Sequence, residues 1–195
     1  MFSTTGNTEA TKTTSWKVVL PFYGYAAIAF LIATILLLFS ASDITSHYFL
    51  PHTLAIIHIM ALGWGTMMIL GASHQLVPVL IEGKLYSNKL AYASFTFAAI
   101  GIPLLVNGFY VFNMGLHTQC GGILIILSVI AYLINLAASM VKSKQENVHA
   151  FFIFTAALWL LATAIVGLLL LYNFTEPLLP KGSLNYLPVH AHIGI

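Results

Sequence analysis

Two stretches of the chain place histidines where a metal could use them. One reads HIMALGWGTMMILGASHQLVPV, beginning at His58 and containing His74. The other reads LPVHAH and holds His190 and His192 two positions apart. A neutral imidazole is a common ligand of transition metals, and an ionisable side chain inside a membrane span usually marks function. These histidines are therefore candidate ligands.

The neighbours of His58 decide what it could hold. An α-helix turns about 100° per residue, so five residues flank His58 on its own face, and three of them are small. They are Ala61, Leu62, Gly65, Ile69 and Ala72. A flat macrocycle standing on an imidazole needs such clearance, so we predict a cofactor site at His58 that includes Ala61 and Gly65. Small residues also allow close helix packing, which leaves a purely structural histidine as the alternative.

The LPVHAH stretch suits a helix that begins near Pro188, since proline is favoured in the first turn. Two histidines at i and i+2 lie roughly 200° apart on a helix. His190 and His192 therefore cannot easily chelate one ion, but they can face two different neighbours, for instance two cofactors. The alternative is that both imidazoles merely solvate the start of the helix.

Composition identifies the medium around these histidines. The chain of 195 residues is 59% hydrophobic and 6% charged, with a mean hydropathy of +0.94. Soluble proteins carry roughly 25% charged residues, so the partner of this chain is the lipid bilayer. A net charge of +2 provides no basic field for nucleic acid, and the single Cys120 excludes an intrachain disulfide.

The apolar segments predict an all-α, polytopic transmembrane bundle. A span needs about 20 mostly apolar residues. Five complete spans are expected, and a sixth begins near Leu187. The five are 17–41, 50–80, 88–113, 117–141 and 149–174. Residues 1–16 are polar and are expected to form a disordered cytoplasmic leader, with the bundle over 17–195. Because the sixth span stops at Ile195, we expect the chain to be the N-terminal half of a longer protein.

The lysines predict the orientation of the bundle. Six of the seven lie before the first span or in the second and fourth connections, and only Lys181 falls on the other side. This positive-inside pattern places the N-terminus in the cytoplasm. His58 would then lie roughly 12 Å below the outer end of its span, at the shallow depth expected for His190 and His192. His74 would lie near the inner surface.

The segment from His58 to Val79 resembles the second helix of the catalytic subunit of the haem–copper oxidase superfamily. In particular, it is similar to divergent bacterial members, a group that includes nitric oxide-responsive haem–copper proteins. In this superfamily an axial ligand of the low-spin haem lies on the second helix near the outer face, and the N-terminus is cytoplasmic. The resemblance covers this helix well, and the other spans only by hydropathy.

The resemblance implies a cofactor and a location. His58 takes the position of a haem ligand, and His190 and His192 become ligands of haem iron or copper. Haem b is the implied cofactor, copper a second, and the bacterial inner membrane the location. Cytochrome c or a quinol would donate electrons, and other oxidase-type subunits would be partners. The chain departs from the oxidases, however, in having HxH on its sixth helix, where they have a single copper ligand.

Three functions follow from these patterns. The first is a respiratory-type redox protein that transfers electrons through a bis-histidine haem, and that could act as an oxidase-like or nitric oxide reductase-like oxidoreductase. The second is a non-catalytic haem or copper protein that responds to nitric oxide. The third is a cofactor-free transporter or scaffold, in which the glycines only tighten helix packing.

Overall fold

The computed structural model describes residues 13–44, 46–143 and 148–194, and every regular element in these ranges is a helix. This confirms the predicted all-α class. Five of the helices are long and apolar enough to cross a membrane, as expected for a transmembrane bundle, whereas the exact number of spans and their orientation stay predictions. They are α1 (Trp16–Phe39), the continuous helix Pro51–Leu80, α5 (Asn88–Tyr110), α6 (Leu116–Lys142) and α7 (Val148–Tyr172). The predicted leader falls mostly on residues 1–12, outside the described residues.

The second span is divided into three helical segments. These are α3 (Pro51–His58), a π-helical segment (Ile59–Thr66) and α4 (Met67–Leu80). Pro51 occupies the first turn of α3, where proline is favoured. Three short elements complete the fold: α2 (Ala41–Ile44), a 3-10 turn (Ser183–Asn185) and α8 (Leu187–Ile193).

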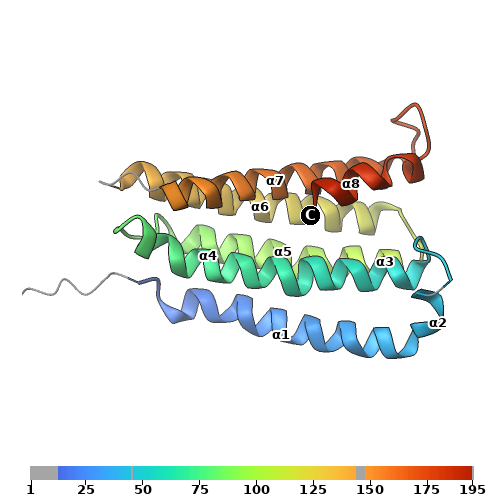
Figure 1. The fold of residues 1–195 in the computed structure, drawn as a ribbon, viewed down its shortest axis with the longest axis horizontal. Helices are drawn as coiled ribbons and strands as arrows, with labels where there is room; N and C mark the ends of the chain where they lie inside the picture. The colour runs from blue at the N-terminus through green and yellow to red at the C-terminus, as the bar shows by residue number, and fades with distance from the viewer. Residues whose placement is uncertain (1–12, 45, 144–147, 195) are drawn as a thin grey trace, which may run out of the picture.

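The long helices run side by side along one direction (Figure 1). In this arrangement α1 packs along the π-helical segment and α4, whereas α3 packs along α5. Helix α5 makes its most extensive contact with α6, and α6 then packs on α7. The short α8 folds back along α7 and ends near the middle of the bundle.

Glycines bring α5 and α6 into backbone contact. A Cβ atom on Gly101 would lie 2.8 Å from the carbonyl oxygen of Gly121, and one on Gly121 would lie 2.6 Å from the amide nitrogen of Leu105. A Cβ atom on Gly108 would meet the side chain of Thr118 even more closely. Small residues at such positions let two membrane helices approach closely and gain van der Waals contact. The central pair of the bundle therefore depends on residues without side chains.

Polar side chains of α6 fix the connection between α4 and α5. The Asn135 amide is fully buried; its oxygen accepts a hydrogen bond from the Ser87 amide nitrogen at 2.9 Å, and its nitrogen donates to the Ser87 carbonyl at 3.0 Å. One turn further on, the Ser139 hydroxyl accepts a hydrogen bond from the Tyr86 amide at 2.9 Å. Asn135 thus satisfies backbone groups of a turn that apolar surroundings would otherwise leave unpaired.

The two ends of the bundle differ in character. Lys17, Lys84, Lys89 and Lys142 lie at one end, which we call the lysine-rich end, and Lys181 lies at the opposite end. At the opposite end, aromatic rings join three connections. The Phe49 ring stacks on Phe174 at 5.7 Å and meets the edge of Phe112 at 6.1 Å. These rings close the bundle at the end where α3 begins.

Candidate metal site

His58 is the last residue of α3, and its ring is fixed by a local hydrogen bond. Nδ1 lies 2.7 Å from the Leu54 carbonyl oxygen, one turn earlier in the same helix. A carbonyl only accepts, so Nδ1 carries the proton and Nε2 keeps its lone pair. The Phe109 ring of α5 lies 4.4 Å from the imidazole ring, at an angle of 43°. His58 therefore has a defined tautomer and a ring neighbour on α5.

The structure brings His190 of α8 opposite His58. The two imidazole rings have centres 6.5 Å apart and planes only 11° apart. The Nδ1 atom of His190 is buried and has no hydrogen-bond partner among the described residues. These two histidines are 132 positions apart in the chain, and the fold brings their rings together in nearly parallel planes.

Gly167 of α7 makes room for the His190 ring. A Cβ atom on Gly167 would lie 2.8 Å from Cε1 of His190 and 3.4 Å from its Nε2. Contacts of 2.8 Å are shorter than carbon atoms tolerate, so an alanine at this position would displace the imidazole. The His190 ring is thus held between α7 and the ring of His58.

The separation of the two ring centres, 6.5 Å, is close to that of two imidazoles on one metal ion, for which a nitrogen of each ring must point at the ion. A metal–nitrogen bond to imidazole is about 2 Å long, and two such bonds plus the distance from each nitrogen to its ring centre come to roughly 6.4 Å. Across residues 13–44, 46–143 and 148–194, no group of three or more His, Cys, Asp or Glu side chains lies close enough to hold a metal ion. A donor set of two imidazoles suits haem iron, because the macrocycle supplies the other four ligands and the protein supplies the axial ones.

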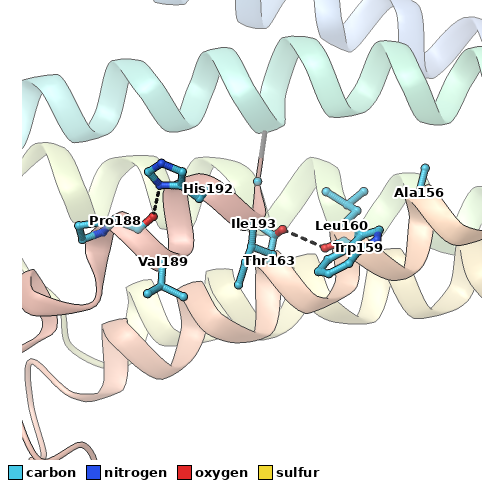
Figure 2. Close-up of a pocket in the computed structure, with 9 residues that line it drawn as sticks. Ala156, Trp159, Leu160, Thr163, Pro188, Val189, His192 and Ile193 are labelled. Carbon is cyan, nitrogen blue, oxygen red and sulfur yellow. Dashed lines mark hydrogen bonds between the residues drawn. The ribbon is translucent and has the colours of Figure 1, made fainter.

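His192 faces away from this pair, as the spacing in LPVHAH predicts. Its Nδ1 atom lies 2.7 Å from the Pro188 carbonyl oxygen, and its side chain lines a cavity of about 850 Å³ between α7 and α8 (Figure 2). Neither His58 nor His190 lines this cavity. The structure therefore separates the candidate ligands: His190 joins His58, and His192 belongs to the far side of α8.

The predicted clearance beside His58 needs a correction. The prediction assumes the periodicity of an α-helix. Residues Ile59–Thr66 form a π-helix, so that periodicity does not hold there. Ala61 is exposed, and its carbonyl accepts a hydrogen bond from the Thr66 hydroxyl at 2.9 Å. A Cβ atom on Gly65 would meet only the Met60 carbonyl, at 3.5 Å. A side chain at Gly65 would therefore have space, but the α-helical face predicted from the sequence does not describe where that space lies.

The other two glycines of this span serve helix packing. A Cβ atom on Gly63 would lie 2.8 Å from Cβ of Ala29, and one on Gly71 would lie 3.0 Å from Cβ of Phe22. Both neighbours belong to α1. The alternative considered from the sequence, in which glycines only allow close packing, thus describes Gly63 and Gly71, whereas Gly65 is different.

Two site residues escaped the analysis of the sequence. Gly167 lies in the apolar run AIVGLLLLY, where a single glycine gives no indication of an imidazole 23 positions later. Phe109 is one of 13 phenylalanines and has no distinctive neighbours in sequence. The π-helical segment carries a weak signal, because two glycines flank Trp64 within it. Only tertiary packing reveals these three features.

Comparison of the chain with protein-family models, with curated proteins and with solved structures gives no match.

Proposed function

We propose that this chain is a multi-pass membrane redox protein in which His58 and His190 would hold one haem iron. The observation that carries the proposal is the pairing of the two imidazole rings, 6.5 Å apart and within 11° of parallel. Bound haem b would supply one-electron chemistry at this position. The chain's own contribution is to hold two neutral imidazoles at a fixed separation in an apolar bundle.

Each residue around the pair has a defined task. The Leu54 carbonyl oxygen accepts a hydrogen bond from Nδ1–H of His58, which leaves Nε2 available to iron. Hydrogen bonds of this kind orient a ligating imidazole and raise its basicity. Gly167 admits the His190 ring, and the Phe109 ring covers His58 on the side of α5. His192, Ala61 and Gly65 are not needed for this pair, and copper has no three-ligand site among the described residues.

The location and orientation form part of the same proposal. Four of the described lysines gather at the lysine-rich end. The positive-inside rule places this end in the cytoplasm, so the paired histidines would lie toward the outer side of a bacterial inner membrane. Electrons would then come from a cytochrome c or a quinol, and oxidase-type subunits would be partners. Oxygen or nitric oxide turnover would need a second, open metal position.

The test is a reduced-minus-oxidised difference spectrum of the purified full chain supplied with haem b. We expect a band of the b type, with the low-spin form that two axial imidazoles impose. His58→Ala and His190→Ala should each abolish this spectrum or leave a high-spin signal. His74→Ala is the matched control, because it removes another buried imidazole from the same span. An unchanged spectrum in His58→Ala would refute the proposal.

One observation also agrees with each of the two other functions. The packing of Gly63 and Gly71 on α1 is what a cofactor-free transporter or scaffold would also show. Elemental analysis that finds neither iron nor copper in protein purified from its host membrane would support that function. A non-catalytic haem protein that responds to nitric oxide would share the ligand pair. It would give the same spectrum, but electrode measurements would detect no consumption of oxygen or nitric oxide.

A further inference from the structure

The span that carries His58 changes both its geometry and its partner along its length. The outer segment, α3, packs on α5, whereas α4 packs on α1. The change takes place in the π-helical segment Ile59–Thr66, which begins at the residue after His58. π-Helical turns are rare and occur frequently at functional sites. This position makes the π-helical segment a candidate for the element that orients His58.

The hydrogen bonds confirm that the backbone is wider here than in an α-helix. The Met67 amide donates to the Leu62 carbonyl, five residues earlier, and to the Trp64 carbonyl, three residues earlier, and not to the residue four earlier. The Thr66 hydroxyl donates to the Ala61 carbonyl, also five residues earlier, at 2.9 Å. The backbone ring closed by the Met67 amide contains one more residue than an α-helical ring. The segment therefore accommodates residues that a regular α-helix of the same length would not hold.

Both flanking segments are anchored, so the segment between them must absorb the difference in rotation. In α3, Leu54 and Ala55 are buried, and the His58 ring contacts Phe109 of α5. In α4, Met67 and Leu70 are almost fully buried. Removal of one residue from a helix rotates one flank against the other by about 100°. A regular α-helix through this span could satisfy one set of contacts only.

We propose that the π-helical segment Ile59–Thr66 is the positioning element of the metal site, because its extra residue turns His58 toward His190 while α4 keeps its contacts with α1. This inference rests on the proposed function for its spectroscopic consequence, but the positioning itself can be tested without a cofactor. Ala61 is the residue to delete, since its side chain is small and exposed and its loss removes little packing.

The test compares the full chain with its Ala61 deletion, with Cys120 replaced by serine in both. Spin labels on Ile57 and Val189, two exposed residues that adjoin His58 and His190, report the distance across the site. Labels on Ile69 and Leu31, exposed residues of α4 and α1, report the distance at the other flank. We expect the deletion to shift the first distance by several ångströms and to leave the second unchanged. In protein that binds haem b, the low-spin spectrum should be lost.

Other outcomes are equally decisive. Unchanged distances in the deletion variant would overturn the proposal, because the extra residue would then have no effect on His58. A change in the Ile69–Leu31 distance alone would also overturn the proposal, since the π-helical segment would then position α4 and not His58. Thr66→Val is the matched control: it removes only the side-chain hydrogen bond to Ala61, so both distances should persist. If wild-type protein binds no haem, the proposed function fails, but the label distances still test the positioning.

Discussion

His58 and His74 lie on the same span and make the same local hydrogen bond, yet their surroundings differ. In each, Nδ1 lies 2.7 Å from the carbonyl oxygen four residues earlier, that of Leu54 or that of Leu70. His58 then faces the ring of His190. His74 is almost completely buried, and its Nε2 atom has no partner among the described residues. This hydrogen bond from Nδ1 to the carbonyl oxygen four residues earlier can form at any histidine in a helix, so it does not by itself identify a metal ligand.

The contacts of His74 are those of a buried histidine that packs against aromatic rings. Its ring stacks on Phe22 of α1 at 5.2 Å and meets the edge of Tyr132 of α6 at 5.2 Å. The Thr14 hydroxyl donates to its backbone carbonyl at 2.6 Å. His74 thus fills space between α1, α4 and α6 at the lysine-rich end. The comparison separates a histidine that packs from a histidine that is paired.

The largest expected effect concerns the pairing itself. Gly167→Val should displace the His190 ring, because even a Cβ atom would lie 2.8 Å from Cε1 of His190. We expect complete loss of the low-spin haem spectrum, with the helical circular dichroism retained. Gly24→Val is the control, since a Cβ on Gly24 meets nothing within 4 Å. A low-spin spectrum that survives in Gly167→Val would show that His190 is not a ligand.

The second prediction concerns stability at His74. His74→Ala would leave a void between Phe22 and Tyr132, and the loss of a large buried side chain costs about 2–4 kcal/mol. The free energy of unfolding, measured in mixed micelles without cofactor, should fall by that amount. His58→Ala should cost less, because the His58 side chain is only partly buried and borders the pair. Equal losses of unfolding free energy in His74→Ala and His58→Ala would show that the two histidines contribute alike to packing.

The third prediction divides the glycines of the same span. Gly71→Val should lower the free energy of unfolding by about 1–3 kcal/mol, the usual cost of overpacking, because the new side chain would meet Phe22 and Tyr23. Gly65→Ala should be neutral or stabilising by up to about 1 kcal/mol, since glycine weakens a helix relative to alanine and space is available there. A large loss on Gly65→Ala would mean that the backbone near His58 is more crowded than the structure shows.

Much of the fold could be predicted from the sequence, because a membrane span is defined by the length and hydropathy of one local segment. The five long apolar helices lie within a few residues of the predicted spans at each end. The separation of His190 from His192 was also predictable, since it depends only on the rotation per residue within a helix.

The geometry of the candidate site could not be predicted in the same way. Which of the two histidines of α8 meets His58 depends on how α8 lies on α7, and Gly167 controls that contact. The π-helical segment is set by two anchored flanks with different partners, so the periodicity of its own residues gives the wrong face for Ala61 and Gly65. Such features arise from long-range contacts, which one sequence does not display.

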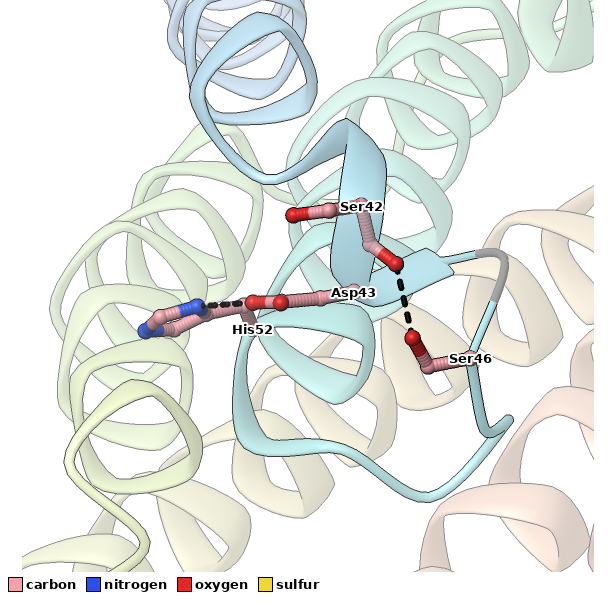
Figure 3. A network of polar contacts seen from close by, with 4 residues as sticks. All are labelled: Ser42, Asp43, Ser46 and His52. Carbon is pink, nitrogen blue, oxygen red and sulfur yellow. Dashed lines mark hydrogen bonds and ion pairs between the residues drawn. The ribbon is translucent and has the colours of Figure 1, made fainter.

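The smallest expected effect concerns another histidine of α3, six residues before His58. His52 Nδ1 lies 2.6 Å from a carboxylate oxygen of Asp43 on α2, and its ring stacks on Tyr110 of α5 at 4.5 Å. Figure 3 shows this contact beside the hydrogen bond, 2.9 Å long, from the Ser46 hydroxyl to the Ser42 carbonyl. Both partners of the pair are about one-third exposed, so water screens their attraction.

A double-mutant cycle with Asp43→Asn and His52→Phe tests that pair, because phenylalanine preserves the stack on Tyr110 while removing the hydrogen bond. The coupling between the two substitutions should be about 0.2–1 kcal/mol in the free energy of unfolding. The low-spin spectrum should be the same in all four proteins, because this pair belongs to the surface of the bundle. A spectral change in His52→Phe would instead link the surface imidazole to His58. Helix α3 would then act as one unit, with both of its histidines contributing to the site.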